Sequence, residues 1–158
     1  MDILNSEFLL FLRCAQQNNL RYLLIGGYAV NYYGYIRHTR DMDIWLAPTN
    51  ENKQKFIDTL LCMQYSENEV MPLHEEDFTK PFVGTVGSNE ADLDVLTFVH
   101  KNISFDNAEK QKKVFEIEPG IFMNIVPYDI LKEMKLLSKR EKDLFDIARL
   151  EEIRDKQK

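Results

Sequence analysis

The chain lacks any apolar run that approaches the roughly 20 residues needed to cross a bilayer. Its acidic N-terminus is unlike a secretory signal peptide, so we expect a cytoplasmic protein without a membrane partner. Internal repeats and low-complexity linkers are absent as well. With 158 residues and 44% apolar content, the sequence predicts a single domain that spans residues 1–158 and can bury a core.

Cysteine and basic charge are also scarce. The only cysteines, Cys14 and Cys62, have no metal-binding spacing, and in a reducing compartment we expect two buried free thiols. The net charge of −6 argues against a broad electrostatic clamp on nucleic acid, although basic residues gather at 37–40 and 132–154. Because no aromatic-basic RNA motif is present either, a pure RNA-binding domain is the least favoured class.

The sequence does contain short apolar strands that alternate with amphipathic helices. This pattern predicts an α+β fold, in which a central mixed sheet is flanked by helices and the C-terminus is helical. Residues 71–76 show no clear period, and we expect a loop or lid there. Strands are predicted at 22–25, 42–47, 81–86, 91–99, 114–117 and 121–126, and helices at 6–18, 28–33, from 50 through 61, and from 128 to the end with a break near 138.

A glycine turn followed by two carboxylates is the main chemical signal. Gly26 and Gly27 end the strand at 22–25, and a glycine backbone can approach a phosphate closely because it has no Cβ. Asp41 and Asp43 enter the next strand, where alternation places both side chains on one face. Paired glycines and paired acids each have ordinary structural explanations, but together they indicate chemistry on a Mg²⁺-bound nucleotide.

A third carboxylate is available in the predicted strand at 91–99. Two-metal transfer needs an acid that ligates one ion and accepts the proton of the acceptor hydroxyl. Asp94 is the best candidate, and Asp92 on the same face is its competitor. A charged residue inside an apolar strand needs a partner, and a metal ion would neutralise three clustered acids.

These residues form a pattern that resembles the small nucleotidyltransferases of the DNA polymerase β-like superfamily. Within it, the chain looks most like the group of AbiEii-type toxins and minimal antibiotic nucleotidyltransferase-like proteins, which implies a minimal nucleotidyltransferase fold and a toxin–antitoxin setting. The resemblance covers the chain from about Tyr22 to Leu150. The strings that carry the resemblance are Gly26-Gly27-x-Ala29, Gly34, Arg37-x-Thr39-x-Asp41-x-Asp43, Leu93-Asp94-Val95-Leu96-Thr97, Leu131-x-x-x-Lys135 and Arg140-x-Lys142-Asp143-x-x-Asp146.

The resemblance implies roles for the three acids and the glycine turn. Gly26 and Gly27 would bind the triphosphate, Asp41 and Asp43 would hold two Mg²⁺ ions, and Asp94 would be both metal ligand and base. Many relatives carry a serine at the second glycine, where its hydroxyl also touches phosphate. Here that contact would have to come from backbone N–H groups.

Four further residues are candidates for nucleotide binding, each with a structural alternative. Arg37 would contact the triphosphate or pair with Asp41, and Thr39 would assist or merely cap a turn. Lys135 and Arg140 would meet phosphate charge from the C-terminal helices, or would form a solvated face with Glu133 and Asp143. By alternation Arg40 is expected to point away from the face of Asp41, or it lies in the preceding loop, and we do not count it in the site.

The expected activity is transfer of an NMP from an NTP, with ATP as the expected nucleotide, to an acceptor with release of pyrophosphate. The acceptor class stays open among tRNA or other RNA, a protein side chain and a small molecule. Since the chain is little larger than a catalytic fold, a homodimer or a partner chain could complete the acceptor site. The alternative is a catalytically inactive nucleotide-binding or regulatory module that acts with a partner chain.

Overall fold

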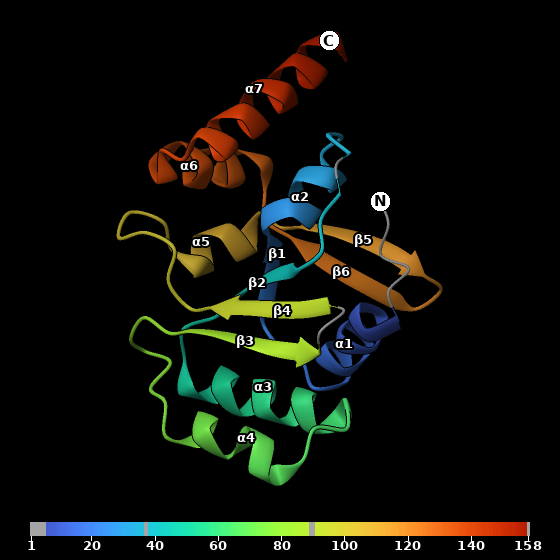
Figure 1. Cartoon of the computed structure of the whole chain (residues 1–158), viewed down its shortest axis with the longest axis vertical. Helices are drawn as coiled ribbons and strands as arrows, with labels where there is room; N and C mark the ends of the chain where they lie inside the picture. The colour runs from blue at the N-terminus through green and yellow to red at the C-terminus, as the bar shows by residue number, and fades with distance from the viewer. Residues whose placement is uncertain (1–5, 37, 89–90, 158) are drawn as a thin grey trace.

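A mixed six-stranded sheet separates two groups of helices in the computed structural model, which describes residues 6–36, 38–88 and 91–157 (Figure 1). This confirms the predicted α+β architecture. The strands are β1 (Tyr22–Ile25), β2 (Met42–Leu46), β3 (Val83–Ser88), β4 (Ala91–Leu96), β5 (Lys113–Glu118) and β6 (Ile121–Ile125). The helices are α1 (Ser6–Gln17), α2 (Gly26–Tyr32), α3 (Asn50–Cys62), α4 (Glu67–His74), α5 (Phe105–Lys110), α6 (Tyr128–Ser138) and α7 (Glu141–Lys156).

The sheet has the strand order β3-β4-β2-β1-β6-β5. Two antiparallel hairpins, β3–β4 and β5–β6, form its edges, and β2 pairs with β4 in parallel and with β1 in antiparallel orientation. The β3–β4 hairpin confirms the predicted pairing, although its turn at 89–90 lies outside the described residues. This order places β2, with its two neighbours β1 and β4, near the middle of the sheet.

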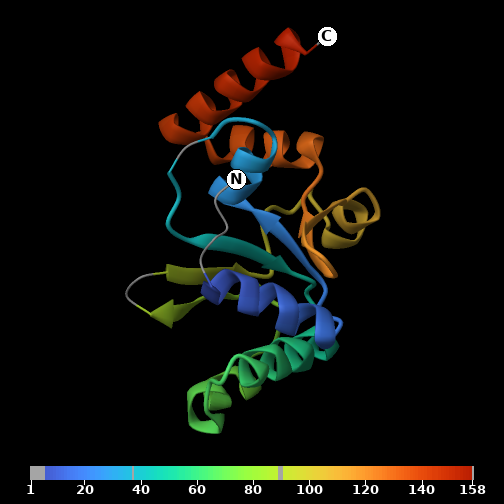
Figure 2. The ribbon, with the colours of Figure 1, turned by 90° about the vertical axis from the view of Figure 1, so that its right-hand side faces the viewer.

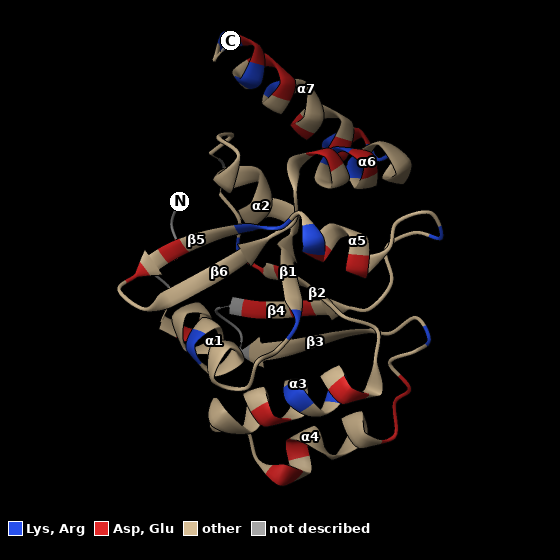
Figure 3. Cartoon of the chain, turned by 180° about the vertical axis from the view of Figure 1, so that it is seen from behind, with Lys and Arg blue, Asp and Glu red and all other residues tan. Residues whose placement is uncertain are grey.

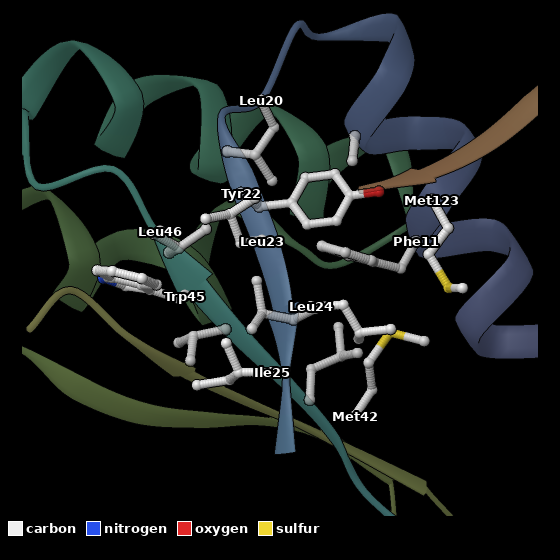
Figure 4. Packing of buried hydrophobic residues seen from close by; sticks show 14 of the residues in the cluster. Phe11, Leu20, Tyr22, Leu23, Leu24, Ile25, Met42, Trp45, Leu46 and Met123 are labelled. Atoms are coloured by element: carbon white, nitrogen blue, oxygen red, sulfur yellow. The ribbon is translucent and has the colours of Figure 1, made fainter. Parts of the chain in front are cut away.

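The main core lies between the sheet and the layer formed by α1, α3 and α4, while α2, α5, α6 and α7 lie on the other side (Figures 1 and 2). Phe11 of α1 meets Tyr22 of β1 edge to face, with ring centroids 5.7 Å apart (Figure 4). Met42 and Ile44 of β2 are fully buried. Because strand side chains alternate, Asp43 then faces the opposite side, toward α2 and the C-terminal helices.

The structure contains two helices that the sequence pattern did not predict. The segment at 71–76, expected as a loop, lies largely in α4, which begins at a reciprocal cap where Ser66 Oγ accepts from the backbone N–H of Glu69. Only Val70 of α4 is buried, so this helix has no apolar period to detect. Helix α5 has six residues, capped by Ser104, and is likewise too short for a periodic signal.

The two cysteines form a disulfide, so the expectation of free thiols is wrong. Cys14 lies in α1 and Cys62 at the end of α3, 48 residues apart in sequence, and their Cα atoms are 5.7 Å apart. Packing of α1 against α3 on one face of the sheet brings them within bonding range. Sequence spacing carries no information on this contact, because it depends on two helices that meet in space.

The C-terminal helices form a hairpin above the acidic face of the sheet, and α7 projects beyond the rest of the fold (Figure 1). Lys139 adopts a left-handed conformation with φ of 56° and ends α6, close to the break predicted near Ser138. No helix within the described ranges is both long and apolar enough to traverse a bilayer.

Candidate active site

The glycine turn fits directly against the acidic strand. Gly26 has a φ of +69°, and a Cβ at this position would overlap Asp43 Oδ2. A Cβ on Gly27 would lie 2.5 Å from Thr39 Oγ1. The turn therefore requires glycine for two reasons, its left-handed backbone and the closeness of Asp43 and Thr39.

Three carboxylates meet beside this turn. Asp43 of β2 lies directly opposite Asp94 in the parallel β2–β4 register, so both side chains project from the same face. Thr85 Oγ1 donates to Asp94 Oδ1 at 2.8 Å and orients that carboxylate. Asp41 lies two residues before Asp43 at the entrance to β2, and its Oδ1 is buried with no hydrogen-bond partner among the described residues.

The pKa of Asp43 is shifted by its burial and by the charges around it. Burial, followed by the negative charges of Asp94 and Asp41, raises the pKa of Asp43 to about 6. Lys135 and Lys142 act in the opposite direction and lower it. Burial and the two neighbouring acids together therefore outweigh the effect of the two lysines on Asp43.

This arrangement fits a divalent cation in its donor chemistry. Carboxylate oxygens are the ligands that Mg²⁺ prefers, and the unpartnered Asp41 Oδ1 is an oxygen that a cation could satisfy. Within the described part of the chain, no group of three or more Asp, Glu, His or Cys side chains is already assembled as a metal cage. Asp41, Asp43 and Asp94 are the residues that would hold the ion.

A cavity of about 410 Å³ opens next to the carboxylates, between the glycine turn and the start of α7. Its lining combines acids at and just before β2 with basic residues from the α6–α7 hairpin, on which residues of both charge signs are interspersed (Figure 3). Seven of the candidate residues other than Asp94 line this cavity together with Asp143. They are Gly26, Gly27, Thr39, Asp41, Asp43, Lys135 and Arg140, of which Asp41 and Asp43 also face Asp94.

Lys135 and Arg140 already have carboxylate partners. Lys135 is 7% exposed, and its Nζ lies 3.0 Å from Asp143 Oδ1 and 3.1 Å from Asp146 Oδ2. Arg140 donates through Nε to Asp143 Oδ2 at 2.9 Å, while its side chain is mostly exposed. The predicted pairing with Asp143 is therefore present, and this cluster joins α6 to α7 at the edge of the cavity.

The structure adds residues that the sequence analysis left out. Arg40, which we did not count in the site, lines the cavity together with His38 and Lys142. Residues 38–40 lie in the loop before β2, as one of the two alternatives predicted, so strand alternation does not apply to Arg40. Lys142 stands inside the Arg140-x-Lys142-Asp143 string, so a signal for it was present. Arg37 lies outside the described residues.

Asp92, the competitor of Asp94, lies closer to the hairpin turn. It is opposite Gly87 of β3, two pairs beyond the Thr85–Asp94 pair, and the β2–β4 register begins only at Leu93. Asp94 is thus the acid of β4 that lies beside Asp43.

Comparison with known proteins supports the fold. No family model matches this chain, and no curated protein matches it in sequence. Among solved structures, it resembles the lincosamide antibiotic adenylyltransferase LnuA, seen with lincomycin bound, with a TM-score of 0.50 and 17% identity over 93% of this chain and 96% of that one. The AbiEii-type group is not distinguished by this likeness. The chain has a minimal nucleotidyltransferase fold.

Proposed function

We propose that this chain is a Mg²⁺-dependent nucleotidyltransferase that moves an NMP from an NTP, ATP in the first instance, to an acceptor and releases pyrophosphate. The observation that carries the proposal is the contact between the glycine turn and the paired strand carboxylates. Gly26 leaves no room for a side chain beside Asp43, and Asp94 lies opposite Asp43 in the sheet. A phosphate held by the turn would therefore lie next to the acids.

The chain's own residues divide the work of the reaction. The backbone N–H groups of Gly26 and Gly27 would hold the triphosphate, and the Thr39 hydroxyl, which occupies the space beside Gly27, would add a side-chain contact. Arg40, Lys135, Arg140 and Lys142 surround the cavity with positive charge. Mg²⁺, when bound by Asp41, Asp43 and Asp94, would neutralise charge on the phosphates and on the acids themselves.

Asp94 is the proposed general base. Its carboxylate would accept the proton of the acceptor hydroxyl, whose oxygen forms a bond to the α-phosphorus. The bond from that phosphorus to the pyrophosphate oxygen breaks, and pyrophosphate leaves with the electron pair. Thr85, hydrogen-bonded to Asp94 Oδ1, is a positioning residue that holds this carboxylate in place.

The proposal is tested by incubating the purified protein with each α-³²P-labelled NTP, Mg²⁺ and a cell extract that contains total RNA. Wild type is expected to label one fraction, and the Asp43→Asn and Asp94→Asn variants are expected to lose at least 100-fold in rate, as for removal of a catalytic acid. The fraction that carries the label distinguishes RNA, protein and small-molecule acceptors.

The alternative, a catalytically inactive nucleotide-binding module, predicts a different result in this assay. A nucleotide-binding module would show a rise in Tm with NTP and Mg²⁺ but no transfer of label to any fraction. That result with a folded wild-type protein would contradict the proposed activity.

A further inference from the structure

A second cavity lies along the sheet from the carboxylates. Its volume is about 380 Å³, within the range of small-molecule sites, and it opens where β2 and β4 end. Trp45, Phe105, Phe98, Thr97, Arg21 and Lys80 contribute to its walls. We name it the Trp45 cavity, since the catalytic roles proposed above use none of these residues.

Trp45, which lines this cavity, has a buried hydrogen-bond donor without a partner among the described residues. The indole is 1% exposed, and Nε1 has no hydrogen-bond partner among the described residues. Figure 4 shows the indole nitrogen on the side of the ring turned away from Leu23, Leu24 and Ile25. A buried donor without a partner is unfavourable, and a ligand oxygen would satisfy it.

The other walls define what kind of molecule fits. Phe105 meets Trp45 edge to face at 5.3 Å, and Phe98 is 49% exposed, so an apolar surface is offered to a ligand. The charge of Arg21 is compensated by Asp106 and Glu109 at 2.8 Å and 2.9 Å. These walls suit a flat, apolar body with an oxygen acceptor, and Lys80 would tolerate an anionic substituent.

The Trp45 cavity lies on the same side of the sheet as the acids. Trp45 follows Asp43 by two residues in β2 and pairs with Leu96, just as Asp43 pairs with Asp94. Two residues of strand correspond to roughly 7 Å. Val83 of the edge strand β3, opposite Leu96, is 78% exposed, so this face of the sheet is open to solvent at the Leu96 pair.

We infer that the Trp45 cavity binds the body of the acceptor, a small molecule with a flat apolar group, an oxygen that accepts from the Trp45 indole, and a hydroxyl that reaches Asp94. This inference rests on the proposed function, because it names the acceptor class of the same reaction. It places transfer to a small organic molecule ahead of transfer to RNA or protein.

The first test measures the cavity alone, without nucleotide or metal. Trp45 is the only tryptophan in the chain, so its emission reports on this site. Titration with the flat aromatic probe 1-anilinonaphthalene-8-sulfonate is expected to quench Trp45 saturably. Phe98→Ser should weaken probe binding by about tenfold, whereas the matched Phe145→Ser on α7, also an exposed phenylalanine, should leave it unchanged. Absence of quenching, or equal effects of the two variants, would overturn the inference.

The second test separates this inference from the proposed function. In the labelled-NTP assay, Phe98→Ser is expected to lower transfer to the small-molecule fraction about tenfold while the rise in Tm with ATP and Mg²⁺ is retained. Full transfer by Phe98→Ser, or label found only in RNA or protein, overturns the acceptor assignment alone. Failure of the proposed function appears instead as a wild-type protein that transfers no label.

Discussion

Asp43 makes the acidic site sensitive to pH. Its pKa rises from an ordinary 3.8 to about 6, so the folded chain holds a proton between these values that the unfolded chain releases. The stability contributed by this group is therefore present below pH 4 and is lost as the pH rises through 6. In the absence of metal, we predict that Asp43→Asn raises the free energy of unfolding at pH 7.5 by up to roughly 3 kcal/mol and has little effect at pH 4. Urea unfolding at the two pH values measures this.

Magnesium provides the control for that prediction. If Asp43 helps to hold the ion, Mg²⁺ should raise the Tm of wild type at pH 7.5 and leave the Tm of Asp43→Asn unchanged. An Asn variant that is no more stable than wild type at pH 7.5 would contradict the charge crowding described here.

The contact between Gly26 and Asp43 can be tested against a second glycine, Gly120, that has a similar backbone conformation. Gly26 and Gly120 both have positive φ, +69° and +82°, but only a Cβ at Gly26 would meet another group, the Asp43 carboxylate. We predict that Gly120→Ala costs about 1 kcal/mol through strain alone, whereas Gly26→Ala costs roughly 3 kcal/mol or more and removes the effect of Mg²⁺ on Tm. Equal losses for the two variants, with Mg²⁺ binding retained, would mean that Asp43 moves aside freely.

At the scale of elements, the α6–α7 hairpin depends on Lys135. Its ammonium lies between the buried carboxylates of Asp143 and Asp146, and hydrogen bonds from Ser138 and Lys135 outweigh burial to hold the pKa of Asp143 below its usual range. Lys135→Met leaves both acids without this ammonium, and we predict a loss of about 3 kcal/mol in unfolding free energy. Lys142→Met, on an exposed lysine of the same hairpin, should change it by less than about 0.5 kcal/mol. Chemical denaturation distinguishes the two, and similar stabilities would refute the structural role of Lys135.

The disulfide joins α1 to α3 and closes a loop of 48 residues. A loop of this length corresponds to about 4 kcal/mol of stabilisation in the chain-entropy model. We predict that Cys62→Ala lowers Tm in non-reducing buffer and that reductant lowers the Tm of wild type but not of the variant. Thiol titration of the unfolded wild type without reductant should find no free thiol. Two reactive thiols there would show that the bond does not form in solution.

For the molecule as a whole, the surface charge bears on its partners. A net charge of −6 opposes binding to a polyanion, so we predict no shift of total RNA in a native gel at 150 mM salt without nucleotide. A clear shift under these conditions would favour an RNA acceptor over the small molecule inferred from the Trp45 cavity.

Much of this architecture was predictable from sequence because its signals are local. The apolar run of β1 and the alternation in β2 depend on neighbouring residues, and both strands were predicted within one residue of their observed ends. Asp94 was recognised as an acid inside an apolar strand. The motif could be recognised from sequence because its residue types, glycines and carboxylates, themselves indicate the chemistry.

Only the tertiary structure decided how these elements meet. The register that sets Asp43 opposite Asp94 joins two segments far apart in the chain, and so does the disulfide between α1 and α3. Arg40 lines the cavity from irregular backbone. No periodic pattern in the sequence describes these three features. Helix α4, which has one buried residue, depends on its cap rather than on an apolar stripe. The sequence by itself therefore determined the strands and the longer helices, and which acids are candidates for the site, because those depend on short-range spacing. The distances between the acids, and the cavity beside Trp45, required the packed fold, because they depend on contacts between residues far apart in the chain.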